Sequence, residues 1–203
     1  MIKVIITFLF LWSFNTLEAQ DRKTILFFGD SITAGYGIDS EDAFPALIQK
    51  KLDSNNYNYR AVNAGLSGET SAGGLRRVEW VLQQSVDIFV LELGGNDGLR
   101  GVDPADTKKN LQGIINIVRE KNPDITLILT GMEAPPNMGQ GYTDAFRQIY
   151  RELAQDNDLH FIPFILEGVA GNPDLNLPDG IHPTEEGHQI VADLVWDTLY
   201  PLL

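Results

Sequence analysis

Residues 24–31 read Thr-Ile-Leu-Phe-Phe-Gly-Asp-Ser, an apolar run that passes directly into a glycine, an aspartate and a serine. An apolar run of this length, closed by a turn residue, predicts a buried strand over residues 24–28. Ser31 then lies at the tip of that strand, where a serine is a candidate nucleophile. The competing interpretation is a serine that caps a helix or fills a turn, which is the more common fate of a Gly-Asp-Ser tripeptide.

The same alternation of strand-like and helix-like segments continues along the chain. Asp103-Pro104 is a strong helix start, because a capping residue precedes a proline at the first helical position, and Asn122-Pro123 stops that helix. Apolar residues at helical spacing predict further helices near residues 44–52, 71–83 and 146–153 and after Thr184, and strands are expected over 57–62, 87–93, 125–130 and 159–163.

This alternation predicts an α/β fold with about five parallel strands, covered by helices on both faces. In such folds ligands bind beyond the carboxyl ends of the strands. Ser31, Asn96 and the loop after Thr130 all follow expected strand ends. The predicted topology therefore brings these segments together at one edge of the sheet.

Residues 179–183 read Asp-Gly-Ile-His-Pro, just before the last expected helix. A hydroxyl is a poor nucleophile until a base takes its proton, and the imidazole of such a base needs a carboxylate to fix its tautomer. The proline after His182 favours an extended loop. Asp179 is then close enough to reach one ring nitrogen while the other faces Ser31. The competing interpretation is a turn aspartate beside a surface histidine.

Histidine is scarce in this chain, and cysteine is absent. Of the other two histidines, His160 opens an expected strand, where a core or edge position is favoured. His188 falls within the last expected helix, where we expect it to be exposed. The absence of cysteine excludes thiolate catalysis, thiolate metal sites and a lipid anchor on cysteine. A core of this size can carry the fold of an exported protein without disulfides.

Residues 93–97 read Leu-Gly-Gly-Asn-Asp and follow the third expected strand. Glycines at a strand end let the backbone approach a ligand closely, and the Asn96 amide can donate to a developing oxyanion. One such donor contributes about 3–4 kcal/mol in hydrolases. Backbone N–H groups of Ser31 and of either Gly65 or Gly68 can complete an oxyanion hole with Asn96. The sequence does not decide which of the two glycines donates. The competing interpretation is an ordinary turn.

The first residues have the layout of a secretory signal peptide, with Lys3, an apolar run over 4–14 and an expected cleavage after Ala19. The competing interpretation is a membrane anchor, but a span needs about 20 apolar residues and this run has roughly half that number. We therefore expect a signal peptide over 1–19, a single domain over 20–203 and no stable membrane anchor after cleavage. The mature protein is expected in the periplasm or the medium.

The formal net charge is −13, and removal of residues 1–19 leaves it unchanged because they hold one lysine and one glutamate. Such a field repels nucleic acid and anionic membrane surfaces, so we expect no nucleic-acid partner. Solubility is the simplest explanation of the acidity.

Taken in order, four motifs resemble those of the SGNH hydrolase superfamily, the GDSL-type esterases. They are Gly-Asp-Ser at 29–31, a glycine after the second strand, Gly-x-Asn-Asp at 94–97 and Asp-x-x-His-Pro at 179–183. The resemblance spans roughly residues 24–200 and is close to the secreted bacterial branch with thioesterase, arylesterase and lysophospholipase activity. It implies a flavodoxin-like three-layer α/β/α sandwich and hydrolysis of esters or thioesters with neither a metal nor a cofactor.

The resemblance also implies a catalytic role for three residues. Ser31 is the nucleophile, His182 the base and Asp179 its partner. His182 accepts the Ser31 proton as the hydroxyl attacks the acyl carbonyl, and the departing alcohol or thiol receives that proton. Water activated by the same histidine then frees the acid, while Asp179 stays ionised.

The oxyanion donors implied by the resemblance are the backbone N–H of Ser31, the side chain of Asn96 and one glycine N–H. In this branch the glycine belongs to a Ser-Gly-acid-Thr segment, which is residues 67–70 here. The resemblance therefore selects Gly68 over Gly65. A glutamate replaces the aspartate that we expect at the acidic position.

Two loops beside the expected site carry apolar side chains suited to an acyl chain. Leu99 lies in the first loop, and Pro135 and Met138 lie in the second. The competing interpretation is that these residues only pack their loops. Arg100 can meet an anionic head group, although an exposed loop arginine usually has no such role. Glu92, within an apolar strand, needs hydrogen-bond partners if buried and is interpreted as support for the loops.

The sequence therefore predicts a secreted serine esterase whose partner is a small acyl ester or lipid substrate, and it leaves the oligomeric state open. One alternative is a carbohydrate acetylesterase on the same fold, but the loop over residues 134–138 is apolar and not an aromatic sugar platform. A second is a non-catalytic lipid-binding module, which does not need serine, histidine and aspartate together. A flavodoxin-type nucleotide binder would need a Gly-x-Gly-x-x-Gly after the first strand, which this chain lacks.

Overall fold

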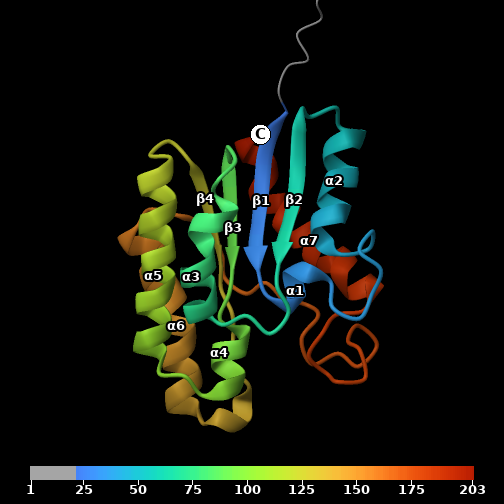
Figure 1. Cartoon of the computed structure of the whole chain (residues 1–203). Coiled ribbons are helices and arrows are strands. Elements are labelled where there is room, and N and C mark those ends of the chain that lie inside the picture. Colours follow the sequence, from blue (N-terminus) through green and yellow to red (C-terminus); the bar gives the residue numbers. More distant parts are fainter. Residues whose placement is uncertain (1–21) are drawn as a thin grey trace, which may run out of the picture.

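The computed structural model describes residues 22–203, so the signal peptide expected over 1–19 lies outside the described residues. Five parallel strands form one sheet with the spatial order β2-β1-β3-β4-β5 (Figure 1). This order is that of flavodoxin-like folds, and it confirms the predicted five-stranded α/β architecture. The strands are β1 (Lys23–Gly29), β2 (Tyr59–Gly65), β3 (Ile88–Glu92), β4 (Thr126–Thr130) and β5 (His160–Ile162).

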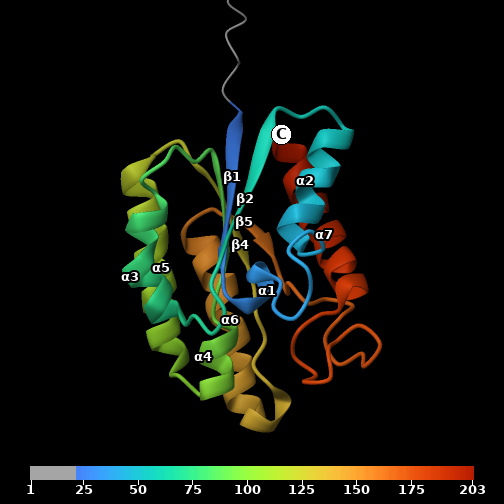
Figure 2. The ribbon, with the colours of Figure 1, turned by 45° about the vertical axis from the view of Figure 1, so that its right-hand side comes forward.

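Helices cover both faces of the sheet, with α3, α5 and α6 on one side and α2 and α7 on the other (Figure 2). The short helices α1 and α4 lie at the carboxyl ends of the strands (Figure 1). Within residues 22–203, no helix combines the length and the apolar character that a membrane span requires. The helices are α1 (Ser31–Ala34), α2 (Phe44–Ser54), α3 (Ser71–Val81), α4 (Gly95–Arg100), α5 (Pro104–Lys121), α6 (Gln140–Asp156) and α7 (Glu185–Leu199), with 3-10 turns η1 (Pro136–Met138) and η2 (Tyr200–Leu202).

Successive residues of β1 hold helices on opposite faces of the sheet, because side chains alternate along a strand. Phe27 packs edge-on against Phe44 of α2, with ring centroids 5.5 Å apart. Phe28 points to the other face, where it contacts Phe89 at 5.5 Å and lies under the guanidinium of Arg77 from α3 at 4.2 Å. The apolar run at the start of the chain is thus the centre of the core.

The second strand occupies Tyr59–Gly65, and the expected range of 57–62 was wrong at both ends. Its pairing with β1 runs from Lys23↔Tyr59 to Gly29↔Gly65. Because β2 is an edge strand and four of its seven residues are only partly buried, its hydrophobic pattern does not mark its ends. Gly65 is therefore the last residue of the strand and does not lie in the loop beyond it.

His188 is buried, with 1% of its surface exposed, so the expectation that it is exposed was wrong. Its Nδ1 accepts a hydrogen bond from the Phe44 backbone N–H at 3.2 Å, and its ring stacks on Phe44 at 6.3 Å. His188 shares a helical face with Val191, Ala192 and Val195, which are also buried against the body of the protein. The histidine therefore joins α7 to the start of α2.

Candidate active site

Ser31 is the first residue of α1, and the preceding strand-to-helix turn determines where its hydroxyl lies. Asp30 caps the helix, because its Oδ1 accepts the Ile32 backbone N–H at 3.0 Å. The turn needs a glycine at position 29, since a Cβ there would lie 2.1 Å from Thr33 Oγ1 and 2.4 Å from Glu92 Oε2. The sequence Gly-Asp-Ser thus turns the chain sharply at the carboxyl end of β1.

The structure brings together the three side chains that were expected to meet there. His182 Nε2 lies 2.9 Å from Ser31 Oγ, and His182 Nδ1 lies 2.7 Å from Asp179 Oδ2. Both distances are those of hydrogen bonds. The arrangement is a continuous relay from a carboxylate through an imidazole to a hydroxyl.

The carboxyl group of Asp179 is held in its ionised form. Burial acts to raise its pKa, but hydrogen bonds from the His182 ring and from the Ile181 and His182 backbone N–H groups outweigh that effect and lower the pKa to about 2. An ionised carboxylate can only accept, so in the neutral imidazole Nδ1 carries the proton and Nε2 presents its lone pair to Ser31. The tautomer is the one that a general base requires.

The loop before α7 holds Asp179 and His182 in place through its own backbone. Leu177 N–H donates to the His182 carbonyl at 2.7 Å. Asn176, which is 6% exposed, donates from Nδ2 to the Val169 carbonyl at 2.7 Å. The loop is therefore fastened at its base, although Asp179 itself is near the surface.

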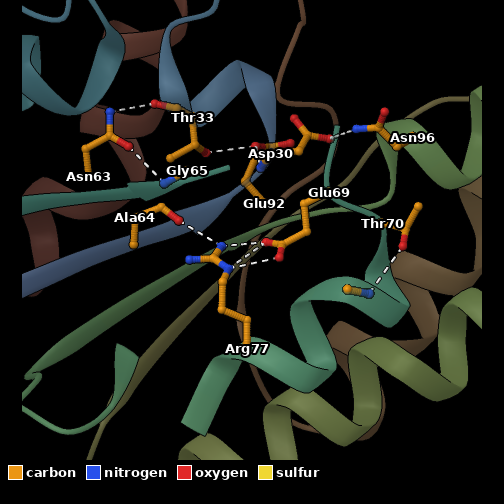
Figure 3. A network of polar contacts seen from close by, with 11 residues as sticks. Asp30, Thr33, Asn63, Ala64, Gly65, Glu69, Thr70, Arg77, Glu92 and Asn96 are labelled. Atoms are coloured by element: carbon orange, nitrogen blue, oxygen red, sulfur yellow. Dashed lines mark hydrogen bonds and ion pairs between the residues drawn. The ribbon is translucent and has the colours of Figure 1, made fainter. Parts of the chain in front are cut away.

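The candidate oxyanion donors lie around the same cavity, which Ser31, Gly68 and Asn96 all line. Gly68 has a φ of +80° in an open loop. In contrast, the Gly65 N–H already donates to Asn63 Oδ1 at 2.9 Å (Figure 3). The strand and motif positions alone did not decide between Gly65 and Gly68 as oxyanion donor. Of these two glycines, Gly68 is the one that lines the cavity.

The Asn96 side chain has a partner at each of its two polar atoms. Its Nδ2 donates to Asp30 Oδ2 at 3.1 Å (Figure 3), and its Oδ1 accepts from Arg100 Nη2 at 3.4 Å. The same guanidinium nitrogen donates to the Gly68 carbonyl at 3.2 Å. Arg100, considered above for an anionic head group, connects two of the segments that surround the cavity.

Two buried carboxyl groups lie behind Ser31. Glu92 Oε2 accepts from the Asp30 backbone N–H at 3.2 Å and from Thr33 Oγ1 at 2.7 Å (Figure 3). Burial raises the pKa of Asp30 to about 6 and, together with the charge of Asp30, raises the pKa of Glu92 well above its usual range. Glu92 thus has the hydrogen-bond partners that its place in an apolar strand requires, and it supports the turn that carries Ser31.

The cavity has a volume of about 820 Å³ and is lined mainly by apolar side chains. Leu99, Pro135 and Met138, which were expected to contact an acyl chain, all lie in its lining, as do His182 and Ser31. The cavity opens beyond the carboxyl ends of the strands. β1 and β3 meet at the point where the strand order reverses, the usual ligand position in such sheets.

Sequence reasoning missed several residues of the cavity. The centroid of the Tyr36 ring lies 4.5 Å from that of the His182 ring, and 52% of the surface of Tyr36 is exposed. Phe164, Leu166 and Ile181 line the cavity from the segment between β5 and α7. That segment follows a strand end, so the rule that located the other loops applies to it as well.

Comparisons with known proteins show the family of the chain. The GDSL-like lipase/acylhydrolase family model matches residues 27–190. Esterase TesA of Pseudomonas aeruginosa is 42% identical over 182 residues, which cover 89% of this chain and 90% of that protein. Thioesterase 1/protease 1/lysophospholipase L1 of Escherichia coli is 39% identical over 93% of this chain and 88% of its own length. A crystal structure of TesA superposes with a TM-score of 0.85 at 42% identity, covering 89% of this chain and all of that chain.

The class defined by the fold and the cavity is that of the ester hydrolases with an α/β/α sandwich. The chain belongs to the GDSL-like lipase/acylhydrolase family, as the motifs at both ends of the sequence indicated, and it is an ester-hydrolysing enzyme.

Proposed function

We propose that this chain is an exported serine esterase that hydrolyses carboxylic esters or thioesters of acyl substrates, of the arylesterase, lysophospholipase and acyl-thioesterase type. The observation that carries the proposal is the relay of hydrogen bonds from Asp179 through His182 to Ser31. Relatives named as an esterase and as a thioesterase and lysophospholipase support the substrate class.

In the proposed mechanism, Ser31 attacks the acyl carbonyl while His182 Nε2 takes its proton. The imidazolium that forms is stabilised by the ionised Asp179, whose pKa of about 2 keeps it charged at neutral pH. His182 then gives the proton to the departing alcohol or thiol. A water molecule, deprotonated by the same imidazole, attacks the acyl-serine ester and releases the carboxylic acid and the free hydroxyl.

The negative charge that develops on the carbonyl oxygen needs donors aimed at the cavity. The proposal assigns this role to the backbone N–H groups of Ser31 and Gly68 and to the second N–H of the Asn96 amide, whose first N–H is bound to Asp30. Such preorganised donors are often the largest single contribution to hydrolase catalysis.

The acyl chain is proposed to lie against Leu99, Pro135 and Met138. Leu99 lies in α4, not in the loop where it was expected, and Pro135 and Met138 lie in the segment between β4 and α6. Methionine adapts to chains of different length. A series of p-nitrophenyl esters tests this assignment, and kcat/KM is expected to rise from acetyl to medium-chain substrates. Activity confined to acetyl esters would instead favour a carbohydrate acetylesterase.

Export is the second part of the proposal. It rests on the composition of residues 1–19, with a lysine at the start and an apolar run too short to span a bilayer. N-terminal sequencing of the protein secreted by a bacterial host is expected to begin at Gln20 or close to it.

The serine mechanism is tested by Ser31→Ala with a p-nitrophenyl acyl ester as substrate. Loss of the nucleophile is expected to lower kcat by about 10⁴-fold or more, with an unchanged circular-dichroism spectrum. Ser54→Ala, at an exposed serine at the end of α2, is the matched control and is expected to keep full activity. Full activity of the Ser31→Ala variant would contradict the proposed serine mechanism.

A further inference from the structure

The side-chain amide of Asn96 has to be oriented one way for the proposed oxyanion hole to exist. The nitrogen and oxygen of a carboxamide are similar in size, so sterics alone do not select between the two orientations. In one orientation Asn96 offers an N–H to the cavity, and in the other it offers a carbonyl oxygen that repels an oxyanion. Neighbouring hydrogen-bonding groups must therefore distinguish the nitrogen of the Asn96 amide from its oxygen.

The Asp30 carboxylate supplies that distinction, because it can only accept hydrogen bonds. Its two oxygens have separate partners: Oδ1 accepts from the Ile32 backbone N–H at 3.0 Å, and Oδ2 accepts from Asn96 Nδ2 at 3.1 Å (Figure 3). On the other side of the amide, the Arg100 guanidinium can only donate, and it contacts Asn96 Oδ1 at 3.4 Å. Both contacts select the same orientation.

Asp30 is itself held rigidly enough to impose this orientation. It is 1% exposed, and its backbone N–H donates to Glu92 Oε2 at 3.2 Å. The same Glu92 oxygen accepts from Thr33 Oγ1 at 2.7 Å, so the turn after β1 is tied to the end of β3 (Figure 3). Asn96 lies just beyond β3, and the buried pair therefore spans the two strands whose ends form the site.

We propose that Asp30 is a positioning residue of the oxyanion hole, which fixes the Asn96 amide so that its second N–H faces the cavity. This inference rests on the proposed esterase function. It assigns the two carboxylate oxygens different tasks: Oδ1 caps α1, and Oδ2 orients the oxyanion donor. The two tasks can therefore be separated by substitution.

The isosteric variant Asp30→Asn is the direct test. An asparagine has one accepting oxygen and one donating nitrogen, so it cannot accept from both the Ile32 N–H and the Asn96 Nδ2. If it keeps the helix cap, its own N–H₂ faces the Asn96 N–H₂. That conflict is relieved when Asn96 flips and its carbonyl oxygen accepts from the new amide, which also replaces the N–H offered to the cavity by an oxygen. We expect kcat to fall by about 10²-fold with little change in KM.

A second variant, Asp30→Ser, protects the test against a folding defect. Serine is a good helix cap, but its hydroxyl is too short to reach Asn96, so the fold is kept while the amide is released. We expect a smaller loss of kcat than in Asp30→Asn, because Asn96 then samples both orientations while Arg100 still favours the productive one. Both assays are run at about pH 8, above the pKa of about 6 of Asp30, so that the wild-type carboxylate is ionised.

A double-mutant cycle with Asn96→Ala separates positioning from a merely structural role. If Asp30 acts through Asn96, either substitution at position 30 lowers kcat in the wild-type background and has little further effect in the Asn96→Ala background. Asn122→Ala is the control, because it removes a partly buried hydrogen bond to the Val86 carbonyl at the end of the sheet opposite the cavity. It is expected to lower the melting temperature and leave kcat close to that of the wild type.

The outcomes are distinct. Equal losses of kcat with and without the Asn96 side chain would overturn the positioning role of Asp30, as would an unchanged kcat in a folded Asp30→Asn protein. A fully active Ser31→Ala protein, by contrast, would overturn the esterase mechanism itself and this inference with it.

Discussion

Glu92 is a single carboxyl group placed inside the sheet, and its chemistry follows from its surroundings. It is 1% exposed, and burial together with the adjacent Asp30 charge raises its pKa well above the usual range. Burial and this neighbouring charge therefore both favour the neutral form of Glu92. Its Oε2 accepts two hydrogen bonds, whereas Oε1 makes no hydrogen bond within residues 22–203. In that neutral form, the proton belongs on Oε1, because Oε2 already accepts two hydrogen bonds.

This assignment predicts that Glu92→Gln is nearly as stable as the wild type. Glutamine keeps one accepting oxygen for the Asp30 and Thr33 donors and places its amide nitrogen where the protonated oxygen was. Glu92→Ala leaves those two buried donors unsatisfied and should lower the free energy of unfolding by about 2 kcal/mol or more. Urea unfolding at neutral pH measures both variants. Equal destabilisation by glutamine and alanine would show that the carboxylate charge is needed.

For individual residues of the candidate site, the sequence predicted those with a recognisable type and spacing. It predicted few of the contacts between them. Ser31 and His182 stand out by motif, and the structure places them 2.9 Å apart. The contact between Asp30 and Asn96 joins residues 66 positions apart, on turns after two different strands. No local pattern specifies such a pair, because it depends on how β1 and β3 align.

The turn between β3 and α4 shows how one element holds another. Gly94 has a φ of +119°, and a Cβ at this position would lie 1.9 Å from the Tyr150 hydroxyl oxygen. Tyr150, from α6, donates that hydroxyl to the Leu93 carbonyl at 2.9 Å. Helix α6 thus holds the turn that leads to Asn96, and only glycine allows the tyrosine to approach so closely.

Gly94→Ala is therefore expected to damage both stability and activity. The positive φ and the clash with Tyr150 together should lower the free energy of unfolding by about 2 kcal/mol or more, and the displaced turn should lower kcat. Gly141→Ala is the matched control. It lies in α6 with no atom near its added Cβ, and it should be neutral or raise stability by about 0.5–1 kcal/mol. Thermal unfolding and ester hydrolysis report both effects, and similar behaviour of the two variants would contradict the account.

Element boundaries were predictable where a residue marks them chemically. Asp103 was expected to cap a helix, and the last helix was expected to follow Thr184. The two side chains accept from the Ala105 and Gly187 N–H groups. The ends of β2 were not predictable, because an edge strand mixes buried and exposed residues and pairing with β1 sets its length. Boundaries set by pairing need the neighbouring strand to be known.

Across the whole molecule, His188 connects the two helices that cover one face of the sheet. Burial lowers its pKa to about 4, with a smaller effect from the charge of His182, against 6.5 for an exposed histidine. The unfolded chain therefore binds a proton between these pH values more readily than the folded protein does. The stability linked to His188 is complete above pH 6.5 and is lost as the pH falls toward 4.

His188→Asn tests this pH dependence. Asparagine can place its Oδ1 near the position of Nδ1 and accept the Phe44 N–H, but it does not titrate. The free energy of unfolding of the wild type should fall by on the order of 3 kcal/mol more than that of the variant between about pH 6.5 and pH 4. Because the measurement is a difference between two proteins, contributions from the carboxyl groups cancel. Parallel pH profiles would contradict the lowered pKa.

The overall architecture was predictable, since alternating apolar strands and helices favour few arrangements. The burial of His188 was not predictable from that alternation. Its spacing with Val191, Ala192 and Val195 matches one helical face, but a polar residue on such a face is usually assigned to solvent. Only the Phe44 N–H at the start of α2 supplies the partner that makes burial favourable, and this contact spans 144 positions of the sequence.

The central claim is that Ser31 is activated by His182, and labelling with a fluorophosphonate measures it most directly. The reagent forms a covalent adduct with an activated serine and not with an ordinary hydroxyl. Mass spectrometry of the folded protein is expected to find one adduct, on Ser31, which His182→Ala abolishes. A folded wild-type protein without that adduct, or with an adduct on Ser31 that persists at the same rate in His182→Ala, would contradict the account.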